Sequence, residues 1–447
     1  MTMDRRDLLK CAPVGLGAVS NVRTLSAQQD TAQFNWAGNV RYGTNRLLNI
    51  ESVEQLQEFV QKQNGLKALG SRHCFSLISD NVHQLISLRS MNRILDIDET
   101  EKTVSVEAGI TYSKLGPELD RQGYALHNLA SLPHISVAGS IATATHGSGS
   151  KNGNLASAVA EIELVTADGE LHTLSRKKDA DGFLGAVVHL GALGIVTRVK
   201  LDIQPTFRIS EYWYHGMKKE HLYENFSQIM NSAYSVSVFS DFKRGFTNEH
   251  WPSIRLKVHQ DAGFEAKPEL FGARLASTIS EKSKKADQST RNTSGAWWER
   301  LPHFTIDGVA AKGNELQTEY FVAIEHATDA IKAVATLADR IQPLLYASEL
   351  RTVAADRLWM STCYEQLSLA IHFTWKSDKE AVCNLLPEIE KRLAPFEPRP
   401  HWGKLFFMGS KTLETRYDRL ADFRQLVDRY DPESKFRNSF LRNKIGI

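Results

Sequence analysis

Gly70-Ser71-Arg72-His73-Cys74-Phe75 carries the strongest evidence in this sequence, and a second small-residue stretch follows it: Ser131-Leu132-Pro133-His134-Ile135-Ser136-Val137-Ala138-Gly139, then Thr143-Ala144-Thr145-His146-Gly147-Ser148-Gly149. Small side chains leave backbone N–H groups uncovered, and a diphosphate needs several such donors at close approach. Apolar Ile135, Val137 and Ile141 are interleaved with them, which argues against a flexible surface loop. The two stretches predict a cradle for a large phosphorylated cofactor.

The histidine of the first stretch indicates a flavin. A neutral imidazole at His73 would act as a nucleophile toward the electron-poor methyl carbon of an isoalloxazine ring and tether the flavin permanently. By itself, a histidine after Gly-Ser-Arg is more often a satisfied hydrogen-bonding residue. A Rossmann dinucleotide site is disfavoured, because Asn152 stands where the third glycine after Gly147 and Gly149 belongs.

Composition describes an ordinary globular chain. Its 447 residues, 42% hydrophobic and 24% charged, suffice for two or three domains. A formal charge of +2, without a basic stripe interleaved with aromatic residues, argues against a nucleic-acid partner and favours a small neutral substrate. The 4 cysteines show no paired spacing, so neither a disulfide scaffold nor a metal site is expected.

The N-terminus is typical of an export signal. Asp4-Arg5-Arg6-Asp7-Leu8-Leu9-Lys10 precedes a weakly apolar run and Leu25-Ser26-Ala27, the pattern of a twin-arginine signal cleaved after Ala27. No run reaches the roughly 18 apolar residues that span a bilayer. We expect residues 1–30 to be this signal and the protein to be periplasmic or secreted; a frayed cytoplasmic tail is the alternative.

Local patterns predict a mixed α+β chain. Ser52 and Gln55 form a capping box for a helix over residues 52–63, and a short buried strand at 66–69 then ends at Gly70, so the loop with His73 leaves a strand end. Asp168-Gly169 predicts a hairpin. The other expected elements are strands at 104–108, 195–203, 347–354 and 367–375, and helices at 111–123 and 420–430.

The texture of the chain changes near residue 213, where long amphipathic segments and aromatic strands begin. We therefore predict an export segment at 1–30, a cofactor domain at 31–212, a substrate domain at 213–403, and a C-terminal segment at 404–447 that returns to the cofactor domain. The charged stretch at 265–293 is poor in large apolar residues and predicts an exposed insertion.

Two polar pairs predict the substrate site. Glu349 and Arg351 are two residues apart on one predicted strand, as are His372 and Thr374 on another, so each pair points to one face. Four buried polar groups are costly unless they meet each other or a polar ligand, and a polyol offers a hydroxyl on every carbon. Either pair in isolation would favour a structural ion pair with surface histidine and threonine, but the two pairs together with Lys404 favour the substrate site.

Several motifs carry a resemblance to a known family. The stretches ASLPHISVAGS, ATHGSG, ELVTADG, GALGIVT, ERLPHF, RTVAAD, HFTW and RPHWGK are spread over nearly the whole chain. With them the chain resembles the alditol oxidases, bacterial members of the vanillyl-alcohol-oxidase flavoprotein family. Cys74 departs from the serine that usually follows the histidine, which weakens one hydrogen bond.

The resemblance implies a fold and a cofactor. The fold is α+β: a two-subdomain FAD-binding domain of the vanillyl-alcohol-oxidase (PCMH) type and an α+β substrate domain with an antiparallel sheet over the flavin. FAD would be attached covalently through His73. The implied cofactor-binding residues are Ala68, Leu69, Gly70, Ser71, Arg72, His73, Cys74, Ser131, Ser136, Gly139, Ala142, Thr143, Ala144, Thr145 and Val196.

The resemblance also implies an activity. A terminal hydroxyl of a xylitol- or sorbitol-like polyol would be oxidised to the aldose by hydride transfer to the flavin, with O2 reduced to H2O2 by a monomeric enzyme. Lys404 or a neighbouring base would accept the hydroxyl proton, and Arg351 would offset charge on the reduced ring. Substrate contacts would come from Ser131, Glu349, Arg351, His372 and Thr374. The implied catalytic residues are Lys404, Arg351 and Glu349.

Two rival functions stay open. A sugar-1,4-lactone oxidoreductase of the same family would share the flavin, His73 and the lysine, and would oxidise a cyclic lactone. Glu349 beside Arg351 favours the open-chain polyol. A secreted flavin- or sugar-binding protein without turnover is disfavoured, because every candidate catalytic side chain is present.

Overall fold

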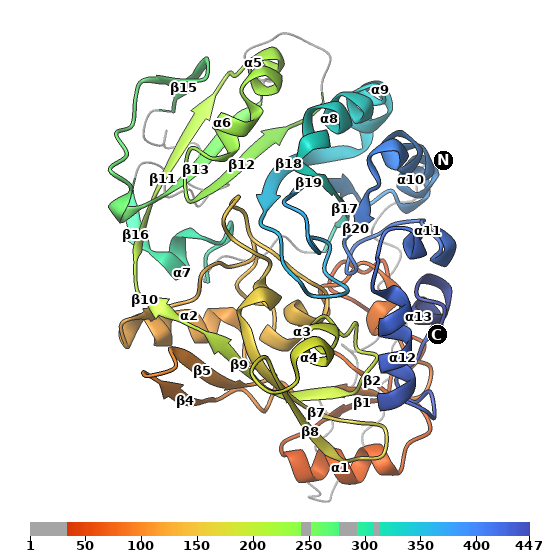
Figure 1. The fold of residues 1–447 in the computed structure, drawn as a ribbon. Coiled ribbons are helices and arrows are strands. Elements are labelled where there is room, and N and C mark those ends of the chain that lie inside the picture. The colour runs from red at the N-terminus through yellow and green to blue at the C-terminus, as the bar shows by residue number, and fades with distance from the viewer. Residues whose placement is uncertain (1–33, 243–251, 277–292, 307–312) are drawn as a thin grey trace, which may run out of the picture.

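The computed structural model describes residues 34–242, 252–276, 293–306 and 313–447, so the predicted export signal at 1–30 lies outside the described residues. Figure 1 shows two halves: small sheets and the C-terminal helices lie in the lower half, and one large sheet lies in the upper half. One contiguous apolar core runs through both, from Val104 below to Trp375 above.

Three short parallel strands begin the lower half. They are ordered β1 (Leu47–Asn49), β3 (Leu85–Ser87) and β2 (Lys67–Ala68). Helix α1 (Val53–Gln61) joins β1 to β2 and confirms the helix predicted at 52–63; the Ser52 hydroxyl accepts a hydrogen bond from Gln55 N at 3.2 Å. As predicted, the loop with His73 follows the short strand β2.

A five-stranded antiparallel sheet forms the rest of the lower half. Its order is β4 (Ile94–Asp98), β5 (Thr103–Glu107), β9 (Ile195–Asp202), β7 (Val159–Val165) and β8 (Leu171–Ser175). The predicted hairpin joins β7 to β8, with Gly169 at φ +84°. Every residue of β5 is buried, its polar Ser105 and Glu107 included, so both faces of this strand are covered. The helices here are α2 (Tyr112–Arg121), α3 (Val137–Ala142) and α4 (Ala180–Val187).

The upper half is built on a ten-stranded sheet. Its order is β14 (Glu269–Leu270), β15 (Ala273–Leu275), β11 (Arg208–His215), β13 (Ser253–His259), β12 (Ser235–Ser240), β18 (Leu345–Val353), β19 (Ser368–Lys376), β17 (Glu315–Ala323) and β20 (Arg399–Pro400), with β16 (Ser294–Ala296) paired to β11. The domain boundary predicted at residue 212 falls inside β11, which belongs wholly to this sheet. The insertion predicted at 265–293 begins with β14 and β15, which extend the sheet, and residues 277–292 lie outside the described ranges.

Helices cover the outer face of the large sheet. Helix α6 (Phe226–Met230) packs on β12, and α8 (Ala327–Ala335) packs on β17 and β19 and against α10 (Lys379–Leu393). The remaining short elements are α5 (Lys219–Glu224), α7 (Trp297–Arg300), α9 (Ala338–Ile341), β6 (Tyr124–Ala125), β10 (Gln204–Pro205), and the 3-10 turns η2 (Leu77–Ser79), η3 (Leu155–Ala158), η4 (Gln260–Ala262), η5 (Ile324–His326), η6 (Gln342–Leu344) and η7 (Ala394–Phe396).

The C-terminal segment returns to the lower half. It contains α11 (Ser410–Glu414), α12 (Leu420–Tyr430) and α13 (Ser439–Lys444) (Figure 1). Leu66 N donates to the Lys435 carbonyl at 2.9 Å, and α12 packs on α4. The C-terminal segment therefore contacts the strand before the His73 loop on the side opposite β3, its neighbour in the sheet.

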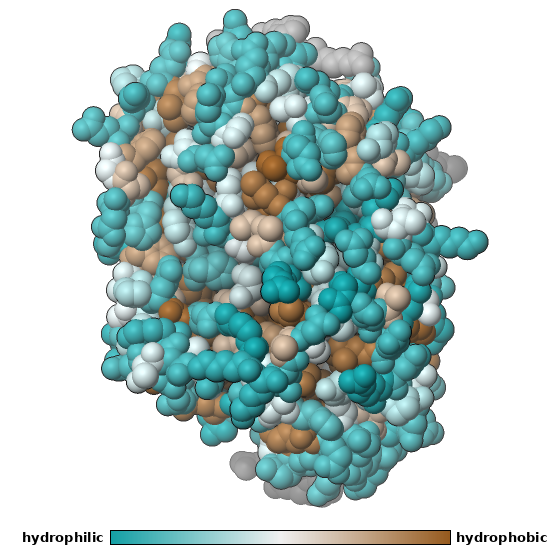
Figure 2. Space-filling view, in the orientation of Figure 1, coloured by the Kyte–Doolittle hydropathy of each residue, from teal (hydrophilic) through white to brown (hydrophobic). Residues whose placement is uncertain are grey.

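The surface on the face of Figure 1 is largely hydrophilic, with apolar residues scattered among polar ones (Figure 2). Among the described residues, no helix combines the length and the apolar character needed to cross a bilayer.

The buried side-chain amide of Asn438 holds the C-terminal segment against the turn at residues 77–80. Asn438 Nδ2 donates to the carbonyls of Leu77, Ile78 and Asp80 at 3.1, 3.0 and 2.8 Å. Asn438→Asp places a carboxylate oxygen against three carbonyl oxygens, so we expect a loss of about 3 kcal/mol in the free energy of unfolding. Thermal unfolding measures it, with exposed Asn64→Asp as the control. Equal melting temperatures for the two variants would contradict the assignment.

Candidate active site

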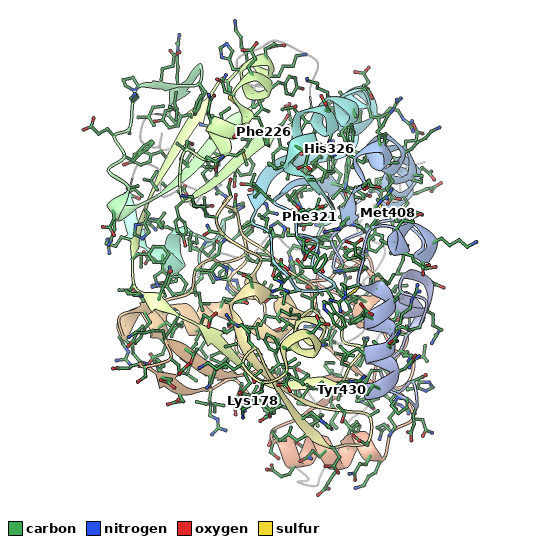
Figure 3. All side chains as sticks on the ribbon, in the orientation of Figure 1. Lys178, Phe226, Phe321, His326, Met408 and Tyr430 are labelled. Atoms are coloured by element: carbon green, nitrogen blue, oxygen red, sulfur yellow. The ribbon has the colours of Figure 1, made fainter. Side chains whose placement is uncertain are left out.

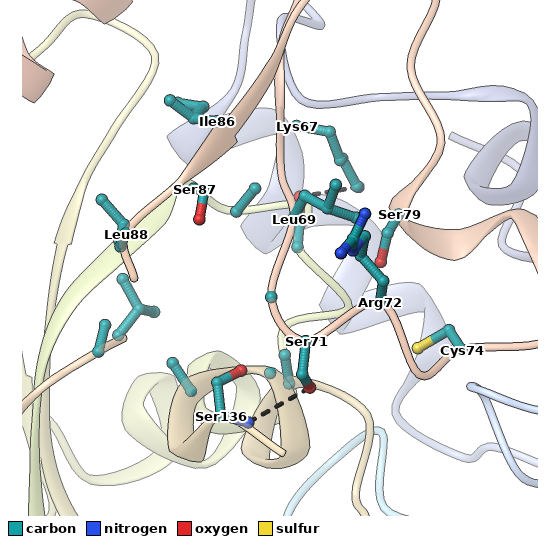
Figure 4. Close-up of a pocket in the computed structure, with 18 of the residues that line it drawn as sticks. Lys67, Leu69, Ser71, Arg72, Cys74, Ser79, Ile86, Ser87, Leu88 and Ser136 are labelled. Carbon is teal, nitrogen blue, oxygen red and sulfur yellow. Dashed lines mark hydrogen bonds between the residues drawn. The ribbon is translucent and has the colours of Figure 1, made fainter. Parts of the chain in front are cut away.

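A cavity of about 830 Å³ lies between the two predicted loops and reaches residues 401–404 beside the large sheet. This volume is near the upper end of the roughly 300–1,000 Å³ typical of ligand pockets. Figure 4 shows part of its wall, where Ser71 and Ser136 meet: Ser136 N donates to Ser71 Oγ at 3.3 Å. The two loops that the sequence singled out therefore form one site.

Most residues predicted to hold the cofactor line this cavity. They are Ala68, Leu69, Gly70, Ser71, Arg72, His73, Cys74, Ser136, Gly139, Ala142, Thr143, Thr145 and Val196, and Lys404 joins them.

Two predicted cofactor residues lie elsewhere. Ala144 is fully buried at φ +52° and shapes the turn after α3. Ser131 lies at the join of the two halves: its Oγ accepts from Arg351 Nη1 at 3.4 Å, and its carbonyl accepts from His303 N at 2.9 Å. Direct contact of Ala144 and Ser131 with a cofactor stays a prediction.

The cavity wall fits a large cofactor such as FAD. A Cβ added at Gly70 or Gly139 would come within 2.7 or 2.8 Å of Ser136 Oγ, so both loops depend on small residues. His73 Nε2 and His189 Nε2 are buried and have no hydrogen-bond partner within the described ranges. Because His189 Nδ1 accepts from Gly191 N at 3.0 Å, the neutral His189 ring carries its proton on Nε2 and leaves a donor at the wall.

His73 is held as a neutral imidazole. Burial first, and the nearby charge of Lys404 second, lower the pKa of His73 to about 3. The ring centroids of His73 and Trp36 are 4.4 Å apart. A neutral ring keeps the lone pair that a nucleophile or a hydrogen-bond acceptor needs.

Both predicted substrate pairs belong to adjacent strands of the large sheet. Glu349 and Arg351 lie on β18, His372 and Thr374 lie on β19, and the register places Glu349 opposite His372. Glu349, Arg351 and His372 are all at least nine-tenths buried. His372 Nε2 lies 3.1 Å from Thr374 Oγ1.

A carboxylate that the sequence analysis missed lies at the centre of this polar face. Glu319, on β17, is opposite His372 in register and only 1% exposed. Its Oε1 accepts from Arg351 Nη2 at 2.6 Å and lies 3.2 Å from His146 Nε2. Burial opposes the charge of Glu319, but Arg351, His146 and His372 together hold its pKa well below the ordinary value. The sequence did contain a signal for this carboxylate: Gln317, Glu319 and Phe321 are two residues apart along one strand, so their side chains point to the same face.

Lys404 comes to this face from the loop after β20. Its Nζ donates to Gln317 Oε1, another residue that the sequence analysis missed, and lies 5.0 Å from the centre of the Phe75 ring. Burial is the main cause that lowers the pKa of Lys404; Glu319 opposes this effect and Arg351 adds to it. Lys404 thus reaches both the cavity wall and the polar face.

The join between the halves is completed by histidines. His146, from the second predicted loop, meets Phe321 of β17 edge to face at 5.0 Å, and Figure 3 shows Phe321 near the middle of the molecule. His303 Nε2 lies 3.3 Å from Glu349 Oε1. His303 belongs to the ERLPHF motif, but the sequence alone assigned it no role.

His146, Glu319 and His401 are close enough to hold a cation, with their ligand atoms within 4.8 Å of one another. Arg351 Nη2 already donates to Oε1 of this carboxylate at 2.6 Å. A divalent cation there would be repelled by this charge, so the cluster is better described as a buried carboxylate paired with Arg351.

Comparisons with known proteins agree with this geometry. Residues 45–175 match the family described as FAD binding domain, and residues 309–444 match D-arabinono-1,4-lactone oxidase. An alditol oxidase from a Streptomyces species is 40% identical over 93% of this chain and 99% of its own length. The chain belongs to the alditol oxidase family. It is an FAD-dependent oxidoreductase, as the sequence predicted.

Two further comparisons agree with this result. The L-gulono-1,4-lactone dehydrogenase of Mycobacterium tuberculosis is 26% identical over 92% of this chain and 98% of its own length. The crystal structure of a cholesterol oxidase from B. sterolicum superposes with a TM-score of 0.74 at 14% identity, covering 92% of this chain and 96% of that one. The predicted α+β fold is confirmed.

The glycine cradle generates a prediction about cofactor content. Gly139→Val adds a branched side chain where even a Cβ meets Ser136 Oγ at 2.8 Å, so we expect the purified protein to lose most of its flavin absorbance per chain. Gly182→Ala is the control, since a Cβ there meets nothing within 4 Å. Full flavin content in Gly139→Val would argue against the cradle.

Proposed function

We propose that this protein oxidises a terminal hydroxyl of an open-chain alditol, of the xylitol or sorbitol class, to the aldose, with O2 as electron acceptor and H2O2 as product. The observation that carries the proposal is the buried row of polar side chains on β17, β18 and β19, next to a lysine that also lines the FAD-sized cavity. The 40% identity to an alditol oxidase supports it.

The polar row suits a chain of hydroxyls. Glu349 lies opposite His372, the Arg351–Ser131 contact lies toward one end of the strands and Thr374 toward the other, so donors and acceptors follow one another along the sheet. Successive carbons of a polyol each present a hydroxyl that can pair with such groups. Unpaired, these buried groups would each cost free energy, which a polyol relieves and an apolar ligand does not.

Oxidation of the alcohol removes one hydride and one proton. Held in the cavity, FAD would supply the two-electron acceptor for the hydride, with O2 as the final oxidant. Lys404 accepts the hydroxyl proton at Nζ, for which it must be neutral, and its lowered pKa favours that state. Gln317 Oε1 accepts a hydrogen bond from Nζ and so orients the lysine lone pair.

Arg351 supplies the fixed positive charge of the site. Burial alone would lower its pKa, but the nearby carboxylates of Glu349 and Glu319 raise it, so the guanidinium stays charged in a dry setting. Such a preorganised charge stabilises the negative charge that hydride transfer delivers to the acceptor.

The proposal includes a covalent bond between FAD and His73. The neutral ring, its unpartnered Nε2 and its position in the cavity wall support it. A tether of this kind retains the cofactor and raises its reduction potential.

A sugar-1,4-lactone oxidoreductase is the second candidate. The match of residues 309–444 to D-arabinono-1,4-lactone oxidase and the 26% identity to a lactone dehydrogenase favour it. A panel of C3–C6 polyols and aldonolactones, scored by flavin bleaching without oxygen, decides between the two candidates whatever the acceptor. Bleaching by lactones alone would overturn the polyol proposal.

The N-terminal residues bear on where this activity takes place. We propose export through the twin-arginine route, supported by Arg5-Arg6 and the apolar run that follows. Fractionation of cells that produce the full chain tests it, and a protein that stays in the cytoplasm at full length overturns it.

Replacement of Lys404 tests its role as the base. Lys404→Met keeps the bound flavin but slows bleaching by the best polyol about 100-fold or more, the usual contribution of a general base. Rapid-mixing absorbance measures the rate, with exposed Lys411→Met as the control. In the wild type the rate rises with pH and levels off below the ordinary pKa of lysine. Unchanged bleaching would remove the lysine from the mechanism.

Removal of the tethering histidine tests the covalent bond. Acid precipitation of the wild type leaves the flavin with the protein pellet, whereas His73→Ala releases it to the supernatant. Exposed His83→Ala is the control and behaves as the wild type. Flavin released from the wild type would show that the cofactor is held without a bond.

A further inference from the structure

Glu319 contacts two of the groups that face the proposed substrate. Its Oε1 accepts from Arg351 Nη2 at 2.6 Å, and its Oε2 lies 3.5 Å from His372 Nδ1, a close contact that does not meet the geometry of a hydrogen bond. On the other side of the ring, His372 Nε2 lies 3.1 Å from Thr374 Oγ1. Carboxylate, imidazole and hydroxyl thus follow one another across β17 and β19.

The carboxylate decides which nitrogen of His372 carries the proton. A proton on Nδ1 points toward the negative charge of Glu319, whereas a lone pair on Nδ1 would face it. Nδ1 makes no hydrogen bond to any residue that the structure describes, and the Glu319 carboxylate is the charged group that lies 3.5 Å from it. Burial lowers the pKa of His372, which keeps the ring neutral with one N–H. Nε2 is therefore the acceptor.

The direction of the next hydrogen bond follows. With Nε2 as acceptor, the hydroxyl of Thr374 must donate to it, and Oγ1 is left with lone pairs only. Thr374 is opposite Gln317 in register, and Gln317 holds Lys404, so Oγ1 lies at the substrate end of the row.

We propose that Glu319 is a positioning residue that sets the substrate class. Through His372 it makes Thr374 a hydrogen-bond acceptor. The site therefore selects a ligand O–H at this point and rejects a carbonyl or ring oxygen. This inference rests on the polyol oxidation proposed above. It accounts for a preference for alditols over lactones, because every alditol oxygen carries a proton and the lactone carbonyl and ring oxygens do not.

The first test reads the tautomer without turnover. In 15N-histidine-labelled holoenzyme, with the His372 signals assigned by their loss in His372→Asn, the wild type should show the proton on Nδ1. Glu319→Gln is nearly isosteric, and its amide oxygen can still accept from Arg351 while its NH2 group faces Nδ1. The proton of His372 should then move to Nε2. A wild-type proton on Nε2 overturns the proposal.

The second test reads specificity. The polyol identified by the panel is compared with its singly deoxygenated and O-methylated analogues at each carbon in turn. One position should lose about tenfold or more in kcat/KM in the wild type, the size expected for one buried hydrogen bond. Glu319→Gln and Thr374→Val should lose this discrimination, and Thr374→Ser should keep it. Unaltered discrimination in Glu319→Gln overturns the proposal.

A control variant and two distinct failures show whether this inference or the proposed function is wrong. Glu390→Gln changes a carboxylate that accepts from Tyr320 on the opposite face of β17, and it should alter neither readout. If the wild type bleaches with no polyol, the proposed function fails while the tautomer remains measurable. If Glu319→Gln does not fold, the wild-type spectrum and the Thr374 pair still decide.

Discussion

Glu319 carries a negative charge in a place from which water is excluded, and the rest of the site is arranged around that charge. Arg351 and His146 approach one of its oxygens and His372 the other. A buried carboxylate is stable only when donors surround it, and a donor that serves it is fixed in orientation. Part of the pKa of Arg351, part of the pKa of Lys404 and, in our proposal, the tautomer of His372 are therefore consequences of this one side chain.

The two halves of the molecule share this constraint. His146 comes from the loop that also builds the cavity, whereas Glu319, Arg351 and His372 come from the large sheet. The network therefore aligns the polar face with the cavity that fits FAD. The C-terminal segment serves the same end on the far side, because it holds the strand that leads to the His73 loop.

Local features were predictable because neighbours in sequence cause them. The cap at Ser52, the hairpin at Gly169 and the strand before His73 each depend on a few adjacent residues. The cradle loops were predictable because so dense a run of small residues is rarely found except where the backbone must approach a ligand closely. β14 and β15 were missed because charged strands of two and three residues at a sheet edge have no apolar period to reveal them.

The sequence by itself determined the mixed α+β fold, the family, the FAD cradle and the polar pairs on β18 and β19, since each is written in contiguous motifs or in the alternation of one strand. Only the tertiary structure decided that Glu319 and Gln317 complete the site and that His303 and His189 border it. Those roles arise from contacts between segments as much as 173 residues apart, such as His146 with Glu319. Strand register and burial, not local sequence pattern, determine which glutamate side chain is removed from solvent.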